Sequence, residues 1–315
     1  MSIAANENGF SPPLHSLRGQ GRDRRRPVTA FVLSGGASLG ASQVGMLAAL
    51  YERRISADLL VATSVGALNA AFVASRPQVP GTSTALARLW CTVRREDVFP
   101  VSVSAFLGGL RGQRDHIVPD HALRRLVRRN IEFEDLAEAP TPLHVVAFDV
   151  IAGREVLLSA GPAVDAVCAA ATIPGLLPVV AMGNQRLIDG SVVNKTPISH
   201  AVALGAERIY VLPTQRGRCA LSEPPRTALD AAMYGLSLAP DGRLERDIAR
   251  YQDEVELIVL PARNPLQVKP GDFAHSSRLI EDARNAVREQ LAVNDVPVRH
   301  RSDVEPVTAA RRTAA

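Results

Sequence analysis

The sequence predicts an α/β fold in which a mostly parallel central sheet is flanked by helices. Two observations support this prediction. Strand-like and helix-like segments alternate near the N-terminal end with short loops between them, an order typical of parallel strands covered by helices. Short apolar segments with strand character return after residue 140, so the sheet is expected to gain further strands. A chain of 315 residues can form one large α/β domain or two smaller ones, and we expect one.

Two strand–helix pairs open the predicted domain. Residues 28–34 (VTAFVLS) form an apolar run followed by glycines, which predicts a buried strand. Residues 40–54 repeat apolar side chains at helical spacing. Residues 58–63 (DLLVAT) predict a second strand, and the small residues of 64–77 predict a helix that Pro77 ends.

The later elements follow a less regular order. Amphipathic helices are predicted over residues 84–100 and 120–131, and the glycine-rich segment 106–115 between them is interpreted as a surface insertion. Strand patterns over 143–150 and 155–159 are joined by a hairpin-type turn. The remaining predictions are a short strand that ends at Asp189, a helix over 199–206, strands over 208–213 and 255–261, and an amphipathic helix over 276–293.

Both ends of the chain are predicted to be disordered tails around a domain of residues 27–294. Residues 295–315 lack periodicity, and residues 1–26 are polar and basic. The formal net charge is +4, and the first 26 residues hold five arginines against two acidic residues, which leaves the domain close to neutral. We interpret this arm as solvated, with contact to anionic lipid headgroups or nucleic acid as the alternative. Aromatic residues make up only 4%, so we expect no nucleic-acid partner.

Cysteine usage and hydropathy point to a cytoplasmic protein. Cys91, Cys168 and Cys219 are widely spaced and form no C-x-x-C pair, which favours a reducing compartment and argues against a zinc site. No apolar run reaches the roughly 18 residues of a membrane span, and the first residues lack the pattern of a signal peptide. Peripheral contact with a membrane is therefore the form of membrane association that we expect.

One serine, Ser64, stands where the second predicted strand becomes the second predicted helix. That position lies at the carboxyl edge of a parallel sheet, where open α/β sheets bind ligands. The local pattern A-T-S-V-G differs from the nucleophile-elbow pattern G-x-S-x-G at its first position, because Ala62 stands there, while Gly66 keeps the other side clear. Ser64 is therefore a candidate nucleophile. The alternative is that Ser64 or Thr63 only caps the helix.

A glycine-rich stretch, LSGGASLG over residues 33–40, ends the first strand and opens the first helix. Amide groups at a helix start lack intrahelical acceptors, so such a loop can hold a phosphate or stabilise an oxyanion. The Gly-Lys-Ser/Thr ending of a phosphate-binding loop is absent, and so is the G-x-G-x-x-G nucleotide fingerprint. We therefore favour an oxyanion formed near Ser64.

Asp189 ends a short apolar strand in the segment RLIDGSVVNKTPI and is followed by Gly190 and Ser191. A carboxylate presented at a sheet edge within reach of Ser64 can act as the general base that takes the serine proton. The alternative is structural, because Asp-Gly is a common turn pair.

Four ordered segments resemble the bacterial patatin-like phospholipases: LSGGASLGASQVGMLAAL, LLVATSVGALNAAFVA, AVCAAATIPGLLPVV and RLIDGSVVNKTPI. The resemblance covers roughly residues 28–292 and implies a three-layer patatin-like fold that hydrolyses acyl esters of lipids without a metal or organic cofactor. It implies a catalytic dyad of Ser64 and Asp189 rather than a triad. It places the oxyanion loop at Gly35, Gly36 and Ala37. The implied partner is a lipid or acyl-ester substrate.

Three positions depart from the family pattern. Ala37 stands at a glycine of the loop, Leu39 at its basic position, and Ala62 at the first glycine of the elbow. If Ala37 needs positive φ, the strain would amount to about 1–2 kcal/mol. Leu39 removes a charge next to the site, so we expect a slower enzyme or one that prefers uncharged acyl esters.

The acyl chain is expected to lie in an apolar groove between helices. Residues 99–110 are a candidate lining segment, although a surface loop is the alternative for them. Pro174 and Gly175 are expected to shape the wall of the pocket.

Three alternatives remain open. An α/β-hydrolase triad would need a histidine after the acid, which leaves His200, His275 and His300; His116, His121 and His144 precede Asp189 and fit no better. The departures also favour a second reading, in which a patatin-fold protein has lost catalysis and serves as a lipid-binding or regulatory module. A nucleotide-binding protein is a remote third, which the missing lysine and acidic ribose contact disfavour.

Overall fold

The computed structural model describes residues 26–100, 111–215, 224, 231, 234–235, 242–262, 268 and 271–294. Its strands are β1 (Thr29–Leu33), β2 (Leu59–Thr63), β3 (Leu143–Asp149), β4 (Arg154–Leu158), β5 (Val180–Met182), β6 (Gln185–Asp189), β7 (Arg208–Leu212) and β8 (Glu256–Val259). Its helices are α1 (Ala41–Glu52), α2 (Val65–Ala74), α3 (Pro80–Thr92), α4 (Arg95–Val98), α6 (His121–Asn130), α7 (Ala163–Ala170), α8 (Ile198–Ala203), α10 (Arg243–Tyr251) and α11 (Ser276–Asn294). Short 3₁₀ turns are η1 (Ala37–Gly40), η2 (Leu136–Glu138) and η3 (Gly190–Val192).

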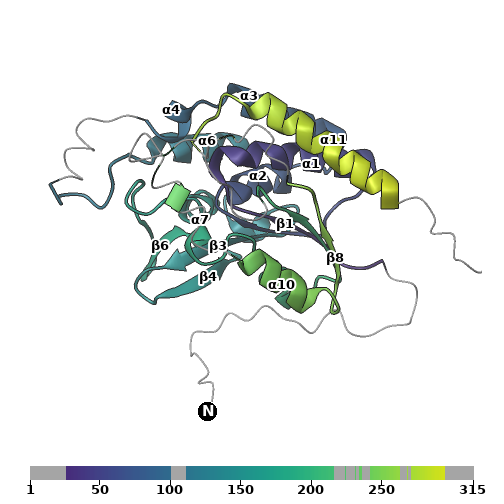
Figure 1. The fold of residues 1–315 in the computed structure, drawn as a ribbon. Coiled ribbons are helices and arrows are strands. Elements are labelled where there is room, and N and C mark those ends of the chain that lie inside the picture. Colours follow the sequence, from purple (N-terminus) through teal and green to yellow (C-terminus); the bar gives the residue numbers. More distant parts are fainter. Residues whose placement is uncertain are drawn as a thin grey trace, which may run out of the picture.

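The sheet lies between two layers of helices (Figure 1). Its strand order is β5-β6-β3-β2-β1-β7-β8, and β4 pairs with β3 beside this path. The strands from β3 through β2, β1 and β7 to β8 are parallel, whereas β4, β5 and β6 form antiparallel pairs at the other end. The predicted α/β fold with a central parallel sheet is confirmed, with an antiparallel end added to it.

Both faces of the parallel strands are covered, which explains their continuous apolar sequence. In β1, Phe31 and Leu33 pack on the side of α1 and α2. Ala30 and Val32 point the other way, into a smaller core formed with α8 and α10. Figure 1 shows α10 on the opposite side of the sheet from α1 and α11.

One edge of β3 brings the ends of β2 and β6 together. Val146 in β3 pairs with Thr63, the last residue of β2, and the next residue, Ala147, pairs with Asp189, the last residue of β6. The partner strand β4 pairs with β3 over residues 145–149 and so takes its other edge. Because a strand has only two edges, β2 and β6 must lie end to end on the same one. The residue that follows β2, Ser64, therefore lies next to Asp189.

The structure differs from the sequence-based expectation in one predicted helix and in several elements that were not predicted. The helix expected over residues 84–100 is two helices, since Val93 has extended backbone angles (φ −66°, ψ 129°) between α3 and α4. The first of them begins at Pro80, whose fixed φ suits the first helical turn. In addition, the helices α7 and α10 and the short strand β5 were not predicted.

Several predictions fall on residues that the structure does not describe. These are residues 1–25, 101–110 and 295–315, together with Cys219 and His300. The domain boundaries therefore stay predictions. Arg26, at the end of the predicted arm, forms an ion pair with Asp58 at 2.5 Å. No helix in the described part of the chain combines the length and the hydrophobicity of a membrane span.

The contact between α1 and α11 depends on a glycine. A Cβ atom on Gly45 would lie 2.0 Å from the carbonyl oxygen of Ile280 in α11, so the two helices approach too closely for any side chain there. We expect Gly45→Ala to lower the free energy of unfolding by about 1–3 kcal/mol, as overpacked cores do. Thermal unfolding measures this as a drop in Tm of several degrees, at about 2–4 °C per kcal/mol for a domain of this size.

Gly81→Ala is the matched control for this prediction. Gly81 also lies in a helix, α3, but a Cβ atom there would meet no other atom within 4 Å. Its Tm should stay the same or rise slightly, because alanine is the better helix former. Equal effects of the two substitutions would mean that α11 does not pack on α1 in this way.

Candidate active site

Ser64 is held in a strained conformation at the turn from β2 to α2. Its φ is 56° and its ψ is −130°, a region that non-glycine residues rarely adopt and that costs about 1–3 kcal/mol. Gly66 makes the turn possible, because a Cβ atom there would lie 2.3 Å from the carbonyl oxygen of Leu33. The Ser64 side chain makes no capping hydrogen bond to α2. The Ser64 hydroxyl therefore does not cap α2.

The hydroxyl of Ser64 donates a hydrogen bond to Asp189. The distance from Ser64 Oγ to Asp189 Oδ2 is 2.6 Å. The other carboxylate oxygen, Oδ1, accepts from the backbone amide of Ser191 at 2.8 Å. Asp189 is fully buried, whereas Ser64 keeps a small exposed surface. The pair therefore has the geometry of a nucleophile and a base, with the base held in position from its far side.

Burial raises the pKa of Asp189 to about 6, although the hydrogen bonds from Ser64 and Ser191 and the charge of Lys195 act in the opposite direction. The dominant cause is desolvation of the carboxylate, which disfavours its ionised form. A carboxyl group with this pKa is ionised at neutral pH and still basic enough to take a proton in a transition state.

The glycine-rich loop lies against Ser64. A Cβ atom on Gly35 would lie 3.0 Å from the Cβ of Ser64, so this close approach requires glycine. The Gly35 amide donates to the carbonyl oxygen of Lys195 at 2.9 Å, which removes it from the expected oxyanion hole. In the described part of the chain, the amides of Gly36 and Ala37 have no acceptor, and both residues line the same pocket as Ser64. These two amides remain the candidates for an oxyanion hole.

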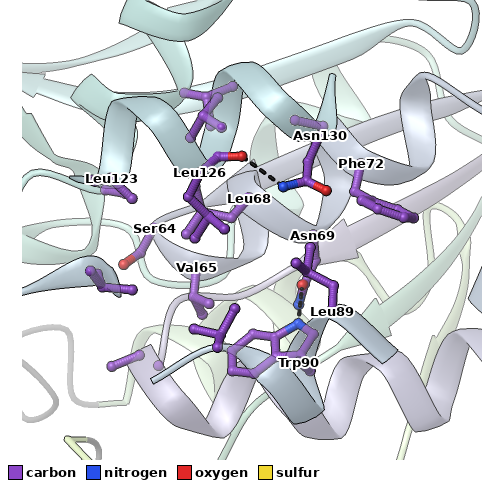
Figure 2. A pocket seen from close by; sticks show the side chains of 18 of the residues that line it. Ser64, Val65, Leu68, Asn69, Phe72, Leu89, Trp90, Leu123, Leu126 and Asn130 are labelled. Atoms are coloured by element: carbon purple, nitrogen blue, oxygen red, sulfur yellow. Dashed lines mark hydrogen bonds between the residues drawn. The ribbon is translucent and has the colours of Figure 1, made fainter. Parts of the chain in front are cut away.

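An apolar pocket runs from Ser64 between three helices. Figure 2 shows Ser64 at one end, with side chains of α2, α3 and α6 around the cavity. The labelled apolar side chains are Val65, Leu68 and Phe72 of α2, Leu89 and Trp90 of α3, and Leu123 and Leu126 of α6. Such a pocket suits a hydrocarbon chain.

The asparagines of this pocket are held by protein groups. Asn69 accepts a hydrogen bond from Trp90 Nε1 at 2.8 Å and donates to the carbonyl oxygen of Gly40 at 3.0 Å. Asn130 donates to the carbonyl oxygen of Leu126 at 2.7 Å (Figure 2). Asn69 therefore joins α2 to α3 and to the glycine-rich loop, whereas Asn130 bonds within α6.

Sequence reasoning missed most of the pocket wall. The residues of α6 and Trp90 line it, although their pattern indicated only amphipathic helices. Of the expected lining segment 99–110, Phe99 lines the pocket and the residues from 101 lie outside the described part. Pro174 and Gly175 were expected in the wall, but both are exposed, and the neighbouring Ile173 lines the pocket instead.

The described histidines do not contact Ser64 or Asp189. His200 lies 3.3 Å from Glu155, and His275 lies 3.4 Å from Asp272. His144 bonds to Ser159, and His116 bonds to Asp115. The described residues also contain no cluster of three or more His, Cys, Asp or Glu side chains able to hold a metal ion.

A sequence model of the patatin-like phospholipases matches residues 31–202, more than half of the chain. The chain belongs to this family. The matched range contains the glycine-rich loop, Ser64 and Asp189.

Two relatives of this family member show how far its sequence has diverged. An NTE family protein of Mycobacterium tuberculosis is 27% identical over 199 residues, which cover 61% of this chain and 30% of the relative. A lysophospholipase of Mycosarcoma maydis is 24% identical over 189 residues, 58% of this chain and 9% of the relative. This chain thus spans less than a third of either relative. Among solved structures, VipD from Legionella pneumophila matches with 12% identity and a TM-score of 0.43, over 84% of this chain and 67% of VipD.

Of the three residues that depart from the family pattern, Ala37 has a strained backbone conformation. Its φ is 50°, in the left-handed region that glycine adopts without strain. We expect Ala37→Gly to raise the free energy of unfolding by about 1 kcal/mol, since relief of the strain exceeds the added entropy of the unfolded chain. Chemical denaturation measures the change.

Arg54→Gly is the control for this prediction. Arg54 also has positive φ, 58°, but it lies after α1 and outside the pocket. Both substitutions should therefore stabilise the protein. A loss of stability in Ala37→Gly, with a gain in Arg54→Gly, would show that the Ala37 methyl group contributes packing that outweighs its strain.

Proposed function

We propose that this patatin-like phospholipase is a serine acyl hydrolase that cleaves acyl esters of lipids with a Ser64–Asp189 dyad. One observation carries the proposal: Ser64 Oγ donates to Asp189 Oδ2 at 2.6 Å, and the serine opens onto an apolar pocket. Support comes from the strained turn at Ser64, which family members with a nucleophile elbow would share. The described histidines lie elsewhere, so a dyad fits better than a triad.

The proposed reaction has two steps. Asp189 accepts the proton of Ser64 as Oγ attacks the ester carbonyl, and the amides of Gly36 and Ala37 stabilise the negative charge that forms on the carbonyl oxygen. The protonated carboxyl group then gives its proton to the departing alkoxide, which leaves as an alcohol. Water attacks the acyl-enzyme with Asp189 again as the base, and the fatty acid is released with Ser64 restored.

The pocket explains why a lipid is the proposed substrate. From Ser64 at one end, the cavity follows α2 past Val65, Leu68 and Phe72, a distance of about 12 Å at the helical rise of 1.5 Å per residue. Burial of a chain of methylene groups there is favourable by about 0.8 kcal/mol for each group. An acyl chain can therefore position its ester carbonyl at Ser64.

A catalytically weakened lipid-binding module is the second candidate function. Leu39 favours it, because this buried side chain lines the pocket at the position where the family resemblance implies a basic residue. The retained contact between Ser64 and Asp189 favours the enzyme.

Single substitutions test the dyad. Ser64→Ala should reduce the hydrolysis of p-nitrophenyl octanoate by about 10³-fold or more, because the nucleophile is lost. Asp189→Asn, which keeps the shape of the side chain, should reduce it by about 10² to 10⁴-fold, the usual contribution of a general base. His200→Ala and His275→Ala should stay within about threefold of the wild type, since neither histidine touches the dyad. A loss of activity in a histidine variant that matches the loss in Ser64→Ala would favour a triad.

The pH profile tests the role of Asp189 as a base. Because the raised pKa is about 6, the active ionised form is present above that pH and disappears as the pH falls through it. The value of kcat/KM should therefore reach a plateau above pH 7 and fall about tenfold per unit below pH 5.5. Rates from pH 4.5 to 8.5, corrected with Ser64→Ala, measure this. An acid limb near pH 4 would mean that the base is an exposed carboxylate.

A further inference from the structure

The backbone of residues 193–195, the segment that follows η3, is bonded to two elements of the candidate active site. The carbonyl oxygen of Asn194 accepts a hydrogen bond from Thr63 Oγ1 at 3.1 Å. The carbonyl oxygen of Lys195 accepts from the Gly35 amide at 2.9 Å. Thr63 directly precedes the candidate nucleophile, and Gly35 directly precedes the two candidate oxyanion amides. The position of this segment therefore affects both halves of the site.

Arg243 is bonded to the same segment from the α10 layer. Its Nη1 donates to the carbonyl oxygen of Val193 at 2.9 Å. Arg243 is the first residue of α10, and Leu244 and Ile248 of this helix pack in the smaller core, on the opposite side of the sheet from α1 and α11 (Figure 1). Three consecutive carbonyl oxygens thus accept from three separate elements: α10, the end of β2 and the glycine-rich loop.

Two carboxylates flank the guanidinium group of Arg243. Glu155 Oε1 on β4 lies 3.5 Å from Nη2, and Asp247 Oδ2 lies 3.7 Å from Nε. Contact with His200 and the charge of Arg243 hold the pKa of Glu155 below its ordinary value, although burial acts in the opposite direction. Glu155 is therefore ionised at neutral pH and restrains the guanidinium group in the direction of the Val193 carbonyl.

We infer that Arg243 is a positioning residue for the acyl-transfer reaction, because its hydrogen bond to the Val193 carbonyl holds the segment 193–195 in place. The inference rests on the proposed function. Arg243 is not among the described residues that line the pocket, so it acts through the backbone. A shift of the segment would move the oxyanion amides relative to Ser64, and small misplacements of catalytic groups slow a reaction strongly. Arg243 lies beyond residue 202, where the match to the family model ends.

Substitutions of Arg243 test the inference with p-nitrophenyl octanoate as the substrate. Arg243→Met should lower kcat by about tenfold or more, the usual effect of losing a hydrogen bond from a charged group. KM should stay within about threefold, because the pocket walls of α2, α3 and α6 are not contacted by this side chain. Arg243→Lys should keep kcat within about threefold of the wild type, since an ammonium group can also donate to the carbonyl oxygen. An equal loss in both variants would overturn the inference.

Two substitutions on the same helix are the matched controls. Arg246→Met removes the same charge from an exposed side chain of α10, and Ile248→Ala weakens the packing of α10 in the smaller core. Both should leave kcat within about twofold, although Ile248→Ala should lower Tm. A tenfold loss of kcat in Arg246→Met would assign the effect to the overall charge of the protein. The same loss in Ile248→Ala would assign it to the packing of the helix, and either result contradicts the inference.

Hydrogen exchange measures the proposed route directly. The Gly35 amide is bonded to the carbonyl oxygen of Lys195, so release of the segment 193–195 should expose this amide to solvent more often. The peptide that contains Gly35 should exchange faster in Arg243→Met than in the wild type, and at the wild-type rate in Arg243→Lys. An unchanged rate in Arg243→Met, whatever its kcat, would mean that the segment is held without the arginine and would sink the inference.

The outcomes separate this inference from the proposed function. If the wild type hydrolyses the ester no faster than Ser64→Ala does, the proposed function fails, and the role of Arg243 in it fails too. If hydrolysis depends on Ser64 and Arg243→Met keeps the wild-type kcat, only the role of Arg243 fails.

Discussion

The contact between Ser64 and Asp189 depends on a single edge of β3. Two consecutive residues of that strand, Val146 and Ala147, pair with the last residues of β2 and β6. Because β2 is parallel to β3 and β6 is antiparallel to it, the two strands approach this point from opposite directions. A shift of either strand by one residue would turn its side chains to the other face and separate the two groups. Gly190 keeps the register possible, because a Cβ atom there would lie 2.4 Å from the carbonyl oxygen of Val146.

Much of this arrangement could be predicted from local patterns. The apolar runs of β1 and β2 and the small residues of α2 gave the parallel core, and two short motifs pointed to Ser64 and Asp189. Features that depend on distant contacts could not be predicted. The donation of the Gly35 amide to Lys195 and the wall made by Trp90 join segments that are far apart in the sequence. The break at Val93 was also missed, although the four charged residues 94–97 interrupt the apolar spacing directly after it.

Three residues of the site lower the free energy of unfolding, and favourable packing elsewhere in the fold must compensate for them. Ser64 and Ala37 both have positive φ, and Asp189 is a carboxylate without access to water. Because the pKa of Asp189 in the folded protein, about 6, lies above its ordinary value, this group favours the folded state below about pH 4 and loses that contribution as the pH rises through 6. The conformation and ionisation that would make the pair reactive are thus the ones that cost stability.

The most direct test of the account is covalent labelling by an alkyl fluorophosphonate, located by peptide mass spectrometry. The account predicts that the phosphonyl group is found on Ser64, and that labelling slows by about 10²-fold or more when Asp189 is replaced by asparagine. A label on another residue, or unchanged labelling of Ser64 without the carboxylate, would mean that the two side chains meet in the structure but do not act together.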